Sequence, residues 1–262
     1  MSVPHISKPM LGFFRKIVQG YFRRHFRAVR VSEAGRFREC GPGPLIVYAN
    51  HSSWWDPMVS VLLAAELMPG REHFAPMDAA ALERYGILKR VGIFGVEMQA
   101  ARGAAQFLRT GLEVLRQDGV LWITPQGKFA DARERPLLFK PGLAALAARV
   151  PGGCTVLPLA IEYTFWDERL PETLLHFGLP VRVNGEASAA VDARLQEALL
   201  ETMETLRLKA MTRDAGEFAL LRKGRVGTGG FYEFGQRVLA RLRGRRFQAE
   251  HTASKIAADE RA

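Results

Sequence analysis

Residues 45–57 read LIVYANHSSWWDP and place a short apolar run directly before a polar loop. The apolar run predicts a buried β-strand. Asp56-Pro57 predicts the start of a helix, because Asp favours the N-cap and Pro is tolerated at the first helical position. His51 and Asp56 are five residues apart, which is about 500° of a regular helix, so they cannot share one helical face. The backbone between them must bend in a strand-to-helix loop, which is typical of an α/β fold.

The His51 and Asp56 side chains also suggest a chemical role. One carboxylate oxygen of Asp56 is expected to cap the helix, while the other accepts a hydrogen bond from a ring nitrogen of His51. Such a bond fixes the imidazole tautomer and leaves the second ring nitrogen free as a general base. In the alternative interpretation, Asp56 is only an N-cap and His51 only a loop residue.

Strand-like apolar runs alternate with helical patterns along the chain. Strands are expected at residues 45–48, 73–75, 91–94, 120–124, 155–163 and 179–183, and helices at 58–67, 79–88, 103–117, 142–150 and 188–211. The alternation predicts a single α/β domain over residues 31–221, with a mixed, mostly parallel sheet covered by helices. Reactive residues are then expected in loops beyond the strand ends, where His51 and Gln126-Gly127 both fall.

Four ordered segments extend this pattern: NHSSWWD (50–56), GIFGVE (92–97), TPQGK (124–128) with FKPG (139–142), and VLPLAI (156–161). They resemble the N-H-x4-D block, the second block, the F-P-E-G-T-R and F-K-x-G block and the V-x-P-V block of the glycerolipid acyltransferase superfamily. This superfamily includes the lysophosphatidic acid acyltransferases. The resemblance implies transfer of a fatty acyl group from acyl-CoA or acyl carrier protein to a lipid hydroxyl, in phospholipid and glycerolipid biosynthesis.

The resemblance also assigns roles to residues. His51 would deprotonate the acceptor hydroxyl and Asp56 would orient the imidazole, while a helix N-terminus or a loop amide near Gly127 would stabilise the oxyanion. A thioester is already activated, so no covalent acyl-enzyme is required. No metal and no cofactor beyond the acyl thioester co-substrate are expected.

Three positions depart from the family pattern, in which two arginines are thought to hold the acceptor's phosphate. Glu97 and Phe129 stand where those arginines would fall, and Gln126 replaces a glutamate. A carboxylate facing a phosphate is a like-charge contact. Two acceptors therefore stay open: 1-acylglycerol-3-phosphate, or a neutral lipid such as a glycolipid or glycosylated carotenoid.

The basic residues of the third block are candidates to replace the missing arginines, although a solvated loop would also explain them. Aromatic residues are candidates to line an acyl groove, although core packing is the alternative explanation. The substrate-binding candidates are Gln126, Gly127, Lys128, Glu97, Arg133, Arg135, Trp54 and Trp55, and the further groove candidates are Phe94, Trp122 and Phe165.

Basic residues concentrate at the two ends of the chain, whose formal net charge is +10. Residues 1–30 contain seven basic residues and no acidic one, and residues 222–246 contain eight basic residues and only Glu233. At 100° per residue, the first segment predicts an amphipathic helix with a basic stripe opposite an apolar face. The stripe is Lys16, Arg23, Arg27 and Arg30, and the face is Leu11, Phe14, Ile17, Val18, Tyr21, Phe22 and Val29.

These ends suggest a membrane surface as partner, with residues 1–30 as a membrane-association helix. Packing of the same helix onto the domain's own core is the alternative. Residues 222–262 are expected to form a basic helix and a disordered tail. No run reaches the roughly 18 apolar residues of a spanning helix and no secretory signal is evident, so a peripheral protein on the cytoplasmic face of a membrane is expected. The two cysteines agree with a reducing compartment.

Two other function classes fit parts of the sequence. A nucleic-acid partner would suit the charge, but the segregation of charge into amphipathic ends without an RNA-stacking motif argues against it. A non-catalytic lipid-binding protein would also suit the membrane features, and it would be indifferent to replacement of His51 by Ala. An acyl carrier protein, which is acidic, is a further possible partner of the basic ends.

Overall fold

The computed structural model describes residues 3–98 and 100–225, and within them nine strands form one mixed sheet. The strand order is β4-β3-β5-β2-β6-β7-β1-β9, and β8 pairs with β6 beside this path. The pairs β3–β4, β3–β5, β5–β2, β2–β6 and β1–β7 are parallel, whereas β6–β7, β6–β8 and β1–β9 are antiparallel. The strands are β1 (Ala28–Ser32), β2 (Leu45–Ala49), β3 (His73–Asp78), β4 (Ile93–Val96), β5 (Val120–Ile123), β6 (Cys154–Thr164), β7 (Glu172–Phe177), β8 (Val181–Val183) and β9 (Ala219–Lys223).

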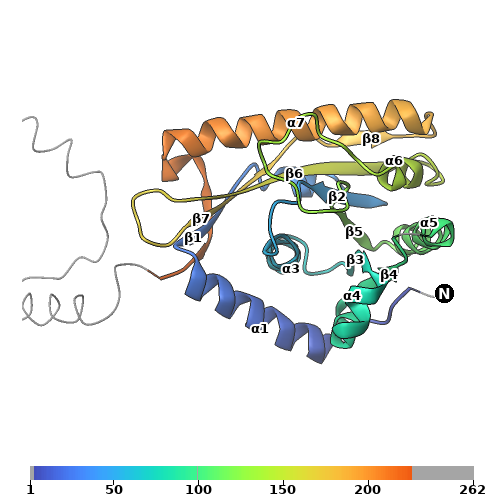
Figure 1. The fold of residues 1–262 in the computed structure, drawn as a ribbon, viewed down its shortest axis with the longest axis horizontal. Helices are drawn as coiled ribbons and strands as arrows, with labels where there is room; N and C mark the ends of the chain where they lie inside the picture. The colour runs from blue at the N-terminus through green and yellow to red at the C-terminus, as the bar shows by residue number, and fades with distance from the viewer. Residues whose placement is uncertain (1–2, 99, 226–262) are drawn as a thin grey trace, which may run out of the picture.

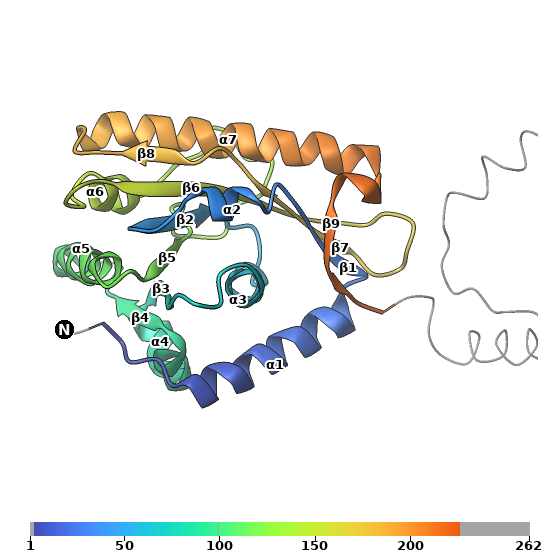
Figure 2. The same cartoon turned by 180° about the vertical axis from the view of Figure 1, so that it is seen from behind.

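Helices cover both faces of this sheet (Figures 1 and 2). On one face α5, α6 and α7 pack over the strands, and on the other lie α1, α2 and α3. The helices are α1 (Lys8–His25), α2 (Arg36–Glu39), α3 (Asp56–Leu67), α4 (Ala79–Arg84), α5 (Ala101–Arg116), α6 (Gly142–Ala147) and α7 (Ser188–Thr212), with 3-10 helices η1 (Gly86–Val91) and η2 (Ala215–Glu217). The expected α/β class, with a mostly parallel sheet covered by helices, is confirmed.

The central strand β2 shows why its sequence is apolar throughout. Ile46 and Tyr48 belong to the core under α5–α7, whereas Leu45, Val47 and Ala49 belong to the core under α1–α3. Successive side chains of a strand point to opposite faces, so a strand buried on both faces needs an unbroken apolar run. The strand then ends where the polar loop with His51 begins.

The N-terminal helix is shorter than expected. It begins at Lys8 and ends at His25, because Phe26 adopts an extended conformation and residues 28–32 form β1 between β7 and β9. The expectation of a helix through residue 30 is therefore wrong, and Arg27 and Arg30 do not belong to a helical stripe. Burial of Val18 and Phe22 shows that part of its apolar face packs onto the domain.

The remaining discrepancies concern other strands. β7 and β9 were not expected, and Arg222 and Lys223 lie in β9 rather than at the start of a terminal segment. The expected C-terminal helix and tail fall within residues 226–262, outside the described residues. In the described part of the chain, no helix is long and apolar enough to cross a membrane.

Candidate active site

His51 and Asp56 meet at the carboxyl end of β2, as their spacing predicted. His51 Nδ1 lies 2.8 Å from Asp56 Oδ2. The Asp56 side chain is only 1% exposed, whereas that of His51 is 17% exposed. Because a carboxylate can only accept, the shared proton is on Nδ1, and Nε2 is left as the basic nitrogen.

Asp56 does not cap the helix in the way expected. It is the first residue of α3, and its carboxylate turns back into the loop, where Oδ2 also accepts from the Ser53 amide at 2.9 Å. Its other oxygen, Oδ1, accepts from the Tyr163 hydroxyl at 2.7 Å. With both oxygens committed to the loop and to β6, neither is left for the helix amides.

Tyr163 reaches Asp56 from the end of β6. Burial, followed by the negative charge of Asp56, raises the pKa of the Tyr163 phenol far above its usual range, so it remains a donor. Charge-assisted bonds of this kind are stronger than neutral ones. Asp56 is thereby fixed by three donors, and its carboxylate in turn fixes the plane of the His51 ring.

Asn50 attaches the loop to the sheet. Its side-chain amide donates to the Ile161 carbonyl at 2.9 Å and accepts from the Ile161 amide at 2.8 Å. The amide group thus replaces one peptide unit of the β2–β6 ladder just beyond the end of β2. Asn50 is buried, so the start of the His51 loop has little freedom.

Gln126 connects the third block to the same loop. Its Oε1 accepts from the His51 amide at 2.7 Å, and the Ala130 amide donates to the His51 carbonyl at 2.8 Å. The Gly127 amide donates to the Thr124 carbonyl within its own turn, so Gly127 itself does not supply a free amide, and an oxyanion donor near it stays a prediction. Gly127 has φ +64°, and a Cβ there would lie 2.6 Å from Lys140 Cε, which explains why glycine occupies this position.

Phe129 lies against the base. Its ring centroid is 4.5 Å from that of His51, and the Phe129 side chain is largely exposed. One side of the imidazole therefore faces an apolar ring at the position where the family has an arginine.

Most of the charged side chains that were candidates for substrate binding form ion pairs with other side chains of the protein. Glu97 pairs with Arg102 at 2.5 Å beyond β4, Arg133 with Asp131 at 2.8 Å, and Arg135 with Glu204 of α7 at 2.8 Å. Lys128 lies on the surface of the third block.

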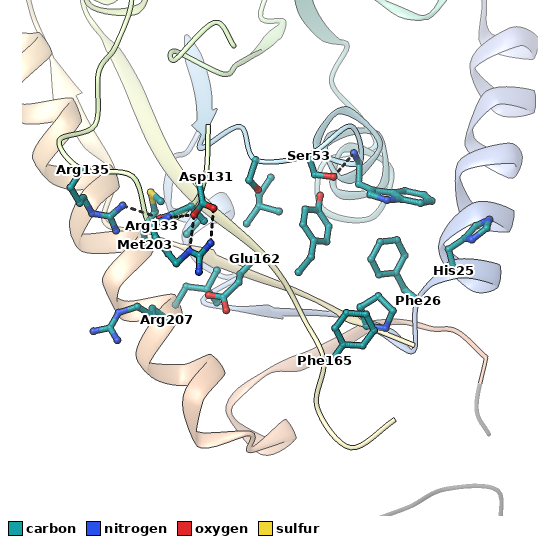
Figure 3. Close-up of a pocket in the computed structure, with 18 residues that line it drawn as sticks. His25, Phe26, Ser53, Asp131, Arg133, Arg135, Glu162, Phe165, Met203 and Arg207 are labelled. Carbon is teal, nitrogen blue, oxygen red and sulfur yellow. Dashed lines mark hydrogen bonds and ion pairs between the residues drawn. The ribbon is translucent and has the colours of Figure 1, made fainter. Parts of the chain in front are cut away.

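A cavity of about 750 Å³ opens beside His51 and Asp56. Ser52, Ser53 and Tyr163 line it, and so bring it next to His51 and Asp56. In Figure 3 His25, Phe26 and Phe165 lie toward α1, whereas the labelled charged side chains gather toward α7.

Trp55 joins this cavity to α1. Its ring packs edge-on against Phe26 at 4.8 Å between centroids, and it also contacts Phe22, His25 and Tyr21. Trp55 lines the cavity, but Trp54 is exposed.

The other groove candidates divide between cavity and core. Phe165 lines the cavity, whereas Phe94 and Trp122 are core residues. For those two the core-packing alternative applies.

Three residues of the site had no role in the sequence-based expectations. Tyr163 is 107 positions from Asp56, and Arg207 lies on α7, so no local pattern connects them with the loop. Asn50 was visible as part of N-H-x4-D, but its bond to Ile161 depends on the β2–β6 pairing.

Among the described residues, no group of His, Cys, Asp and Glu is placed to hold a metal ion.

Comparison with known proteins agrees with this geometry. The family model Acyltransferase matches residues 28–162, just over half of the chain. The crystal structure of the 1-acyl-sn-glycerophosphate (LPA) acyltransferase PlsC from Thermotoga maritima is similar in fold, with a TM-score of 0.52, 16% identity, and coverage of 73% of this chain and 78% of that chain. The search of curated proteins found no match. From the family model, which spans both the His51–Asp56 loop and the third block, the chain belongs to the Acyltransferase family.

Proposed function

We propose that this protein transfers a fatty acyl group from a thioester, acyl-CoA or acyl carrier protein, to a hydroxyl of a lipid acceptor, with His51 as general base. The observation that supports this most directly is the 2.8 Å contact between His51 Nδ1 and the buried Asp56 carboxylate, which accepts three hydrogen bonds in all. An imidazole oriented in this way presents Nε2 to a substrate hydroxyl.

The reaction needs no further group to balance. Nε2 takes the hydroxyl proton as the acceptor oxygen attacks the thioester carbonyl carbon, which forms a tetrahedral oxyanion. The carbon–sulfur bond then breaks, and the imidazolium returns its proton to the leaving thiolate. Base catalysis of this type contributes roughly 10²- to 10⁴-fold.

The acceptor is a lipid in glycerolipid or phospholipid synthesis. Its phosphate-bearing form, 1-acylglycerol-3-phosphate, is supported by the substrate named for the similar PlsC structure. The neutral form is supported by Glu97 and Phe129 at the positions of the family's arginines and by the partners that engage Arg133 and Arg135.

The first experiment measures thiol release from oleoyl-CoA with and without a monoacyl lipid acceptor, for the wild type and His51→Ala. We expect acceptor-dependent release that falls at least 100-fold in the variant. The control is His5→Ala, which removes an exposed histidine near the N-terminus. Equal release from wild type and His51→Ala would contradict the proposal and favour a non-catalytic lipid-binding protein.

We also propose that the outer face of α1 rests on the cytoplasmic surface of an anionic membrane. Phe13, Lys16, Tyr21, Arg23 and Arg24 are exposed on this helix, and none of its first- or last-turn residues is acidic. Aromatic side chains enter the headgroup region and cations lie near anionic lipids, each basic residue contributing about 1 kcal/mol. Exposed Trp54, which contacts Trp55, continues this surface toward the cavity.

Point variants test this better than deletion of residues 1–30, which would remove β1 residues and the buried Val18 and Phe22. The double variant Phe13→Ser and Lys16→Glu should reduce binding to phosphatidylglycerol-containing liposomes at least tenfold. Its activity on a detergent-dispersed acceptor should stay within twofold. Leu208→Ser, at an exposed position of α7, is the matched control. Unchanged liposome binding by the double variant would overturn the membrane assignment.

A further inference from the structure

The cavity beside His51 has two chemically different halves (Figure 3). Toward α1 it is aromatic, with Phe26, Trp55 and Phe165. Toward α7 it is charged, with side chains from three separate segments: the loop within the third block, β6 and α7. The charged lining residues are Asp131, Arg133, Arg135, Glu162 and Arg207.

The lining carries three arginines and two carboxylates, Asp131 and Glu162. Arg133 forms a two-point contact with Asp131, with Nε–Oδ1 at 2.9 Å and Nη2–Oδ2 at 2.8 Å. Glu204 of α7, which does not itself line the cavity, accepts from Arg135 at 2.8 Å and from Arg207 at 2.7 Å. The positive charge of the three arginines is balanced only when this third carboxylate is included.

Glu162 faces the cavity from β6, between Ile161 and Tyr163. Its burial raises the pKa of the carboxyl group, and the positive charge of nearby Arg207 acts in the opposite direction. The next residue, Tyr163, donates to Asp56. Glu162, in the charged half, is therefore adjacent in β6 to Tyr163, whose hydroxyl holds the Asp56 carboxylate.

The loop that carries Asp131 is attached to the backbone of His51. Ala130 donates its amide to the His51 carbonyl, and Asp131 follows directly. Lys128 and Lys140, the other cations of the third block, do not line the described cavity.

A balanced set of arginines and carboxylates suits some ligands and opposes others. A phosphate accepts hydrogen bonds but does not donate them when fully ionised, and it meets repulsion from each carboxylate. A hydroxyl both donates and accepts, so it can bond to a guanidinium and a carboxylate together. Like-charge contacts across an interface discriminate strongly between partners.

On the basis of the acyl transfer proposed above, we infer that this charge-balanced half of the cavity selects an acceptor with an uncharged, hydroxyl-bearing headgroup, glycerol or sugar, over one that carries a phosphate. The aromatic half takes the apolar chain. Glu162 and Arg207 are the specificity-determining pair, one disfavouring and the other favouring a negative headgroup.

The test compares acceptors that differ by the phosphate alone. With oleoyl-CoA as donor, kcat/KM is measured for 1-oleoylglycerol and for 1-oleoylglycerol-3-phosphate, with a monoglucosyl diacylglycerol to separate glycerol from sugar headgroups. Wild type should favour a neutral acceptor at least tenfold. A preference for the phosphate-bearing acceptor would overturn the inference.

Two variants should move this preference in opposite directions. Glu162→Gln leaves one positive charge in excess and should raise the ratio of phosphate-bearing to neutral kcat/KM about tenfold, whereas Arg207→Gln should lower it. Glu113→Gln is the matched control, because Glu113 pairs with Arg116 on α5 outside the cavity. A purely structural role would reduce both acceptors together, so an unchanged ratio in both variants would overturn the assignment.

Failure of the underlying function has a different signature. If no acceptor of either class supports His51-dependent thiol release with oleoyl-CoA or with oleoyl-acyl carrier protein as donor, the proposed acyl transfer fails. If release depends on His51 but favours the phosphate-bearing acceptor, only the headgroup inference fails.

Discussion

The His51 loop (residues 50–56) and the loop within the third block (residues 128–135) lie side by side but differ in burial and in hydrogen bonding. In residues 50–56, Asn50 and Asp56 are buried, and their polar atoms are bonded to β6 or to the loop itself. In residues 128–135 most side chains are exposed, and that of Arg133 is 88% exposed and pairs with Asp131. The difference predicts that substitutions in the buried loop affect stability and the proposed chemistry more than substitutions in the exposed loop do.

Asp56→Asn should have the largest effect on activity, because Asp56 accepts the hydrogen bonds that hold the buried loop and the His51 ring. An amide can present its NH2 group to His51 Nδ1 and favour the wrong tautomer, so Nε2 would carry the proton. We expect kcat to fall roughly 10²- to 10⁴-fold with little change in KM, measured by thiol release. A fall of less than fivefold, in a protein with unchanged thermal unfolding, would show that Asp56 does not orient the base.

Asn50→Ala should primarily reduce stability. It leaves the Ile161 amide and carbonyl without their bonds to Asn50, and a buried unpaired group costs about 1–3 kcal/mol. The free energy of unfolding in urea should decrease by at least about 1 kcal/mol, and activity should fall as the His51 loop loosens. Arg133→Ala is the control from the exposed loop, where surface ion pairs contribute roughly 0–1 kcal/mol.

Tyr163→Phe removes one of the three donors to Asp56 and keeps the ring. A bond to a charged group contributes about 1.5–3 kcal/mol, which corresponds to roughly 10- to 160-fold, so kcat should fall at least about tenfold. Tyr85→Phe, at an exposed tyrosine, serves as the control. The same loss in both variants would mean that the Tyr163 hydroxyl has no specific role.

The buried part of the molecule also predicts a dependence of stability on pH. Burial lowers the pKa of His73 and His176 to about 4 each, with Trp122 Nε1 donating to His73 and Ser32 Oγ in contact with His176. Since an unfolded histidine has a pKa near 6.5, the native state binds fewer protons below that pH. Their contribution to stability is complete above about pH 6.5 and is lost as the pH falls toward about 4.

Urea unfolding at pH 7.5, 5.5 and 4.5 measures this dependence. His176→Asn should make the decrease in unfolding free energy shallower, because one of the two groups that gain a proton on unfolding is gone. An identical pH profile for variant and wild type would contradict the assignment to His176.

Lys128→Ala should have the smallest effect. The residue is exposed and does not line the described cavity, so kcat/KM for a neutral acceptor should stay within about twofold of wild type. A loss of tenfold or more that appears only with 1-oleoylglycerol-3-phosphate as acceptor would instead support Lys128 as a phosphate-binding residue.

The sequence contained enough to predict the central βα unit. The apolar run of β2 and the five-residue spacing of His51 and Asp56 are local signals. The first predicts a strand buried on both faces, and the second predicts a bent loop between the strand and the helix. The alternating residues of β1 were misread because Arg27, Val29 and Arg30 also fit the 100° spacing of the preceding helix. The strand is defined by its pairing with β7 and β9, which no short window can reveal.

The sequence predicted which loops meet at the site, and Gln126 does contact the His51 loop, but it did not predict most of the individual contacts between distant segments. Asp56 was correctly paired with His51, but the expected helix cap failed because Tyr163, from β6, takes the other oxygen. Arg133 and Arg135 were recognised as candidate phosphate-binding residues, but the partner of Arg135, Glu204, lies on α7, far away in the sequence. Arg133 pairs within its own segment, with Asp131, whereas the engagement of Arg135 could not be predicted from its segment.

The most direct test of the central claim, that His51 and Asp56 act as one base, is a double-mutant cycle. Thiol release is measured for wild type, His51→Ala, Asp56→Asn and the double variant, with unfolding midpoints recorded in parallel. If Asp56 acts only through His51, the double variant should be no slower than His51→Ala. Additive losses, with the double variant slower by the product of the two single effects, would contradict the account.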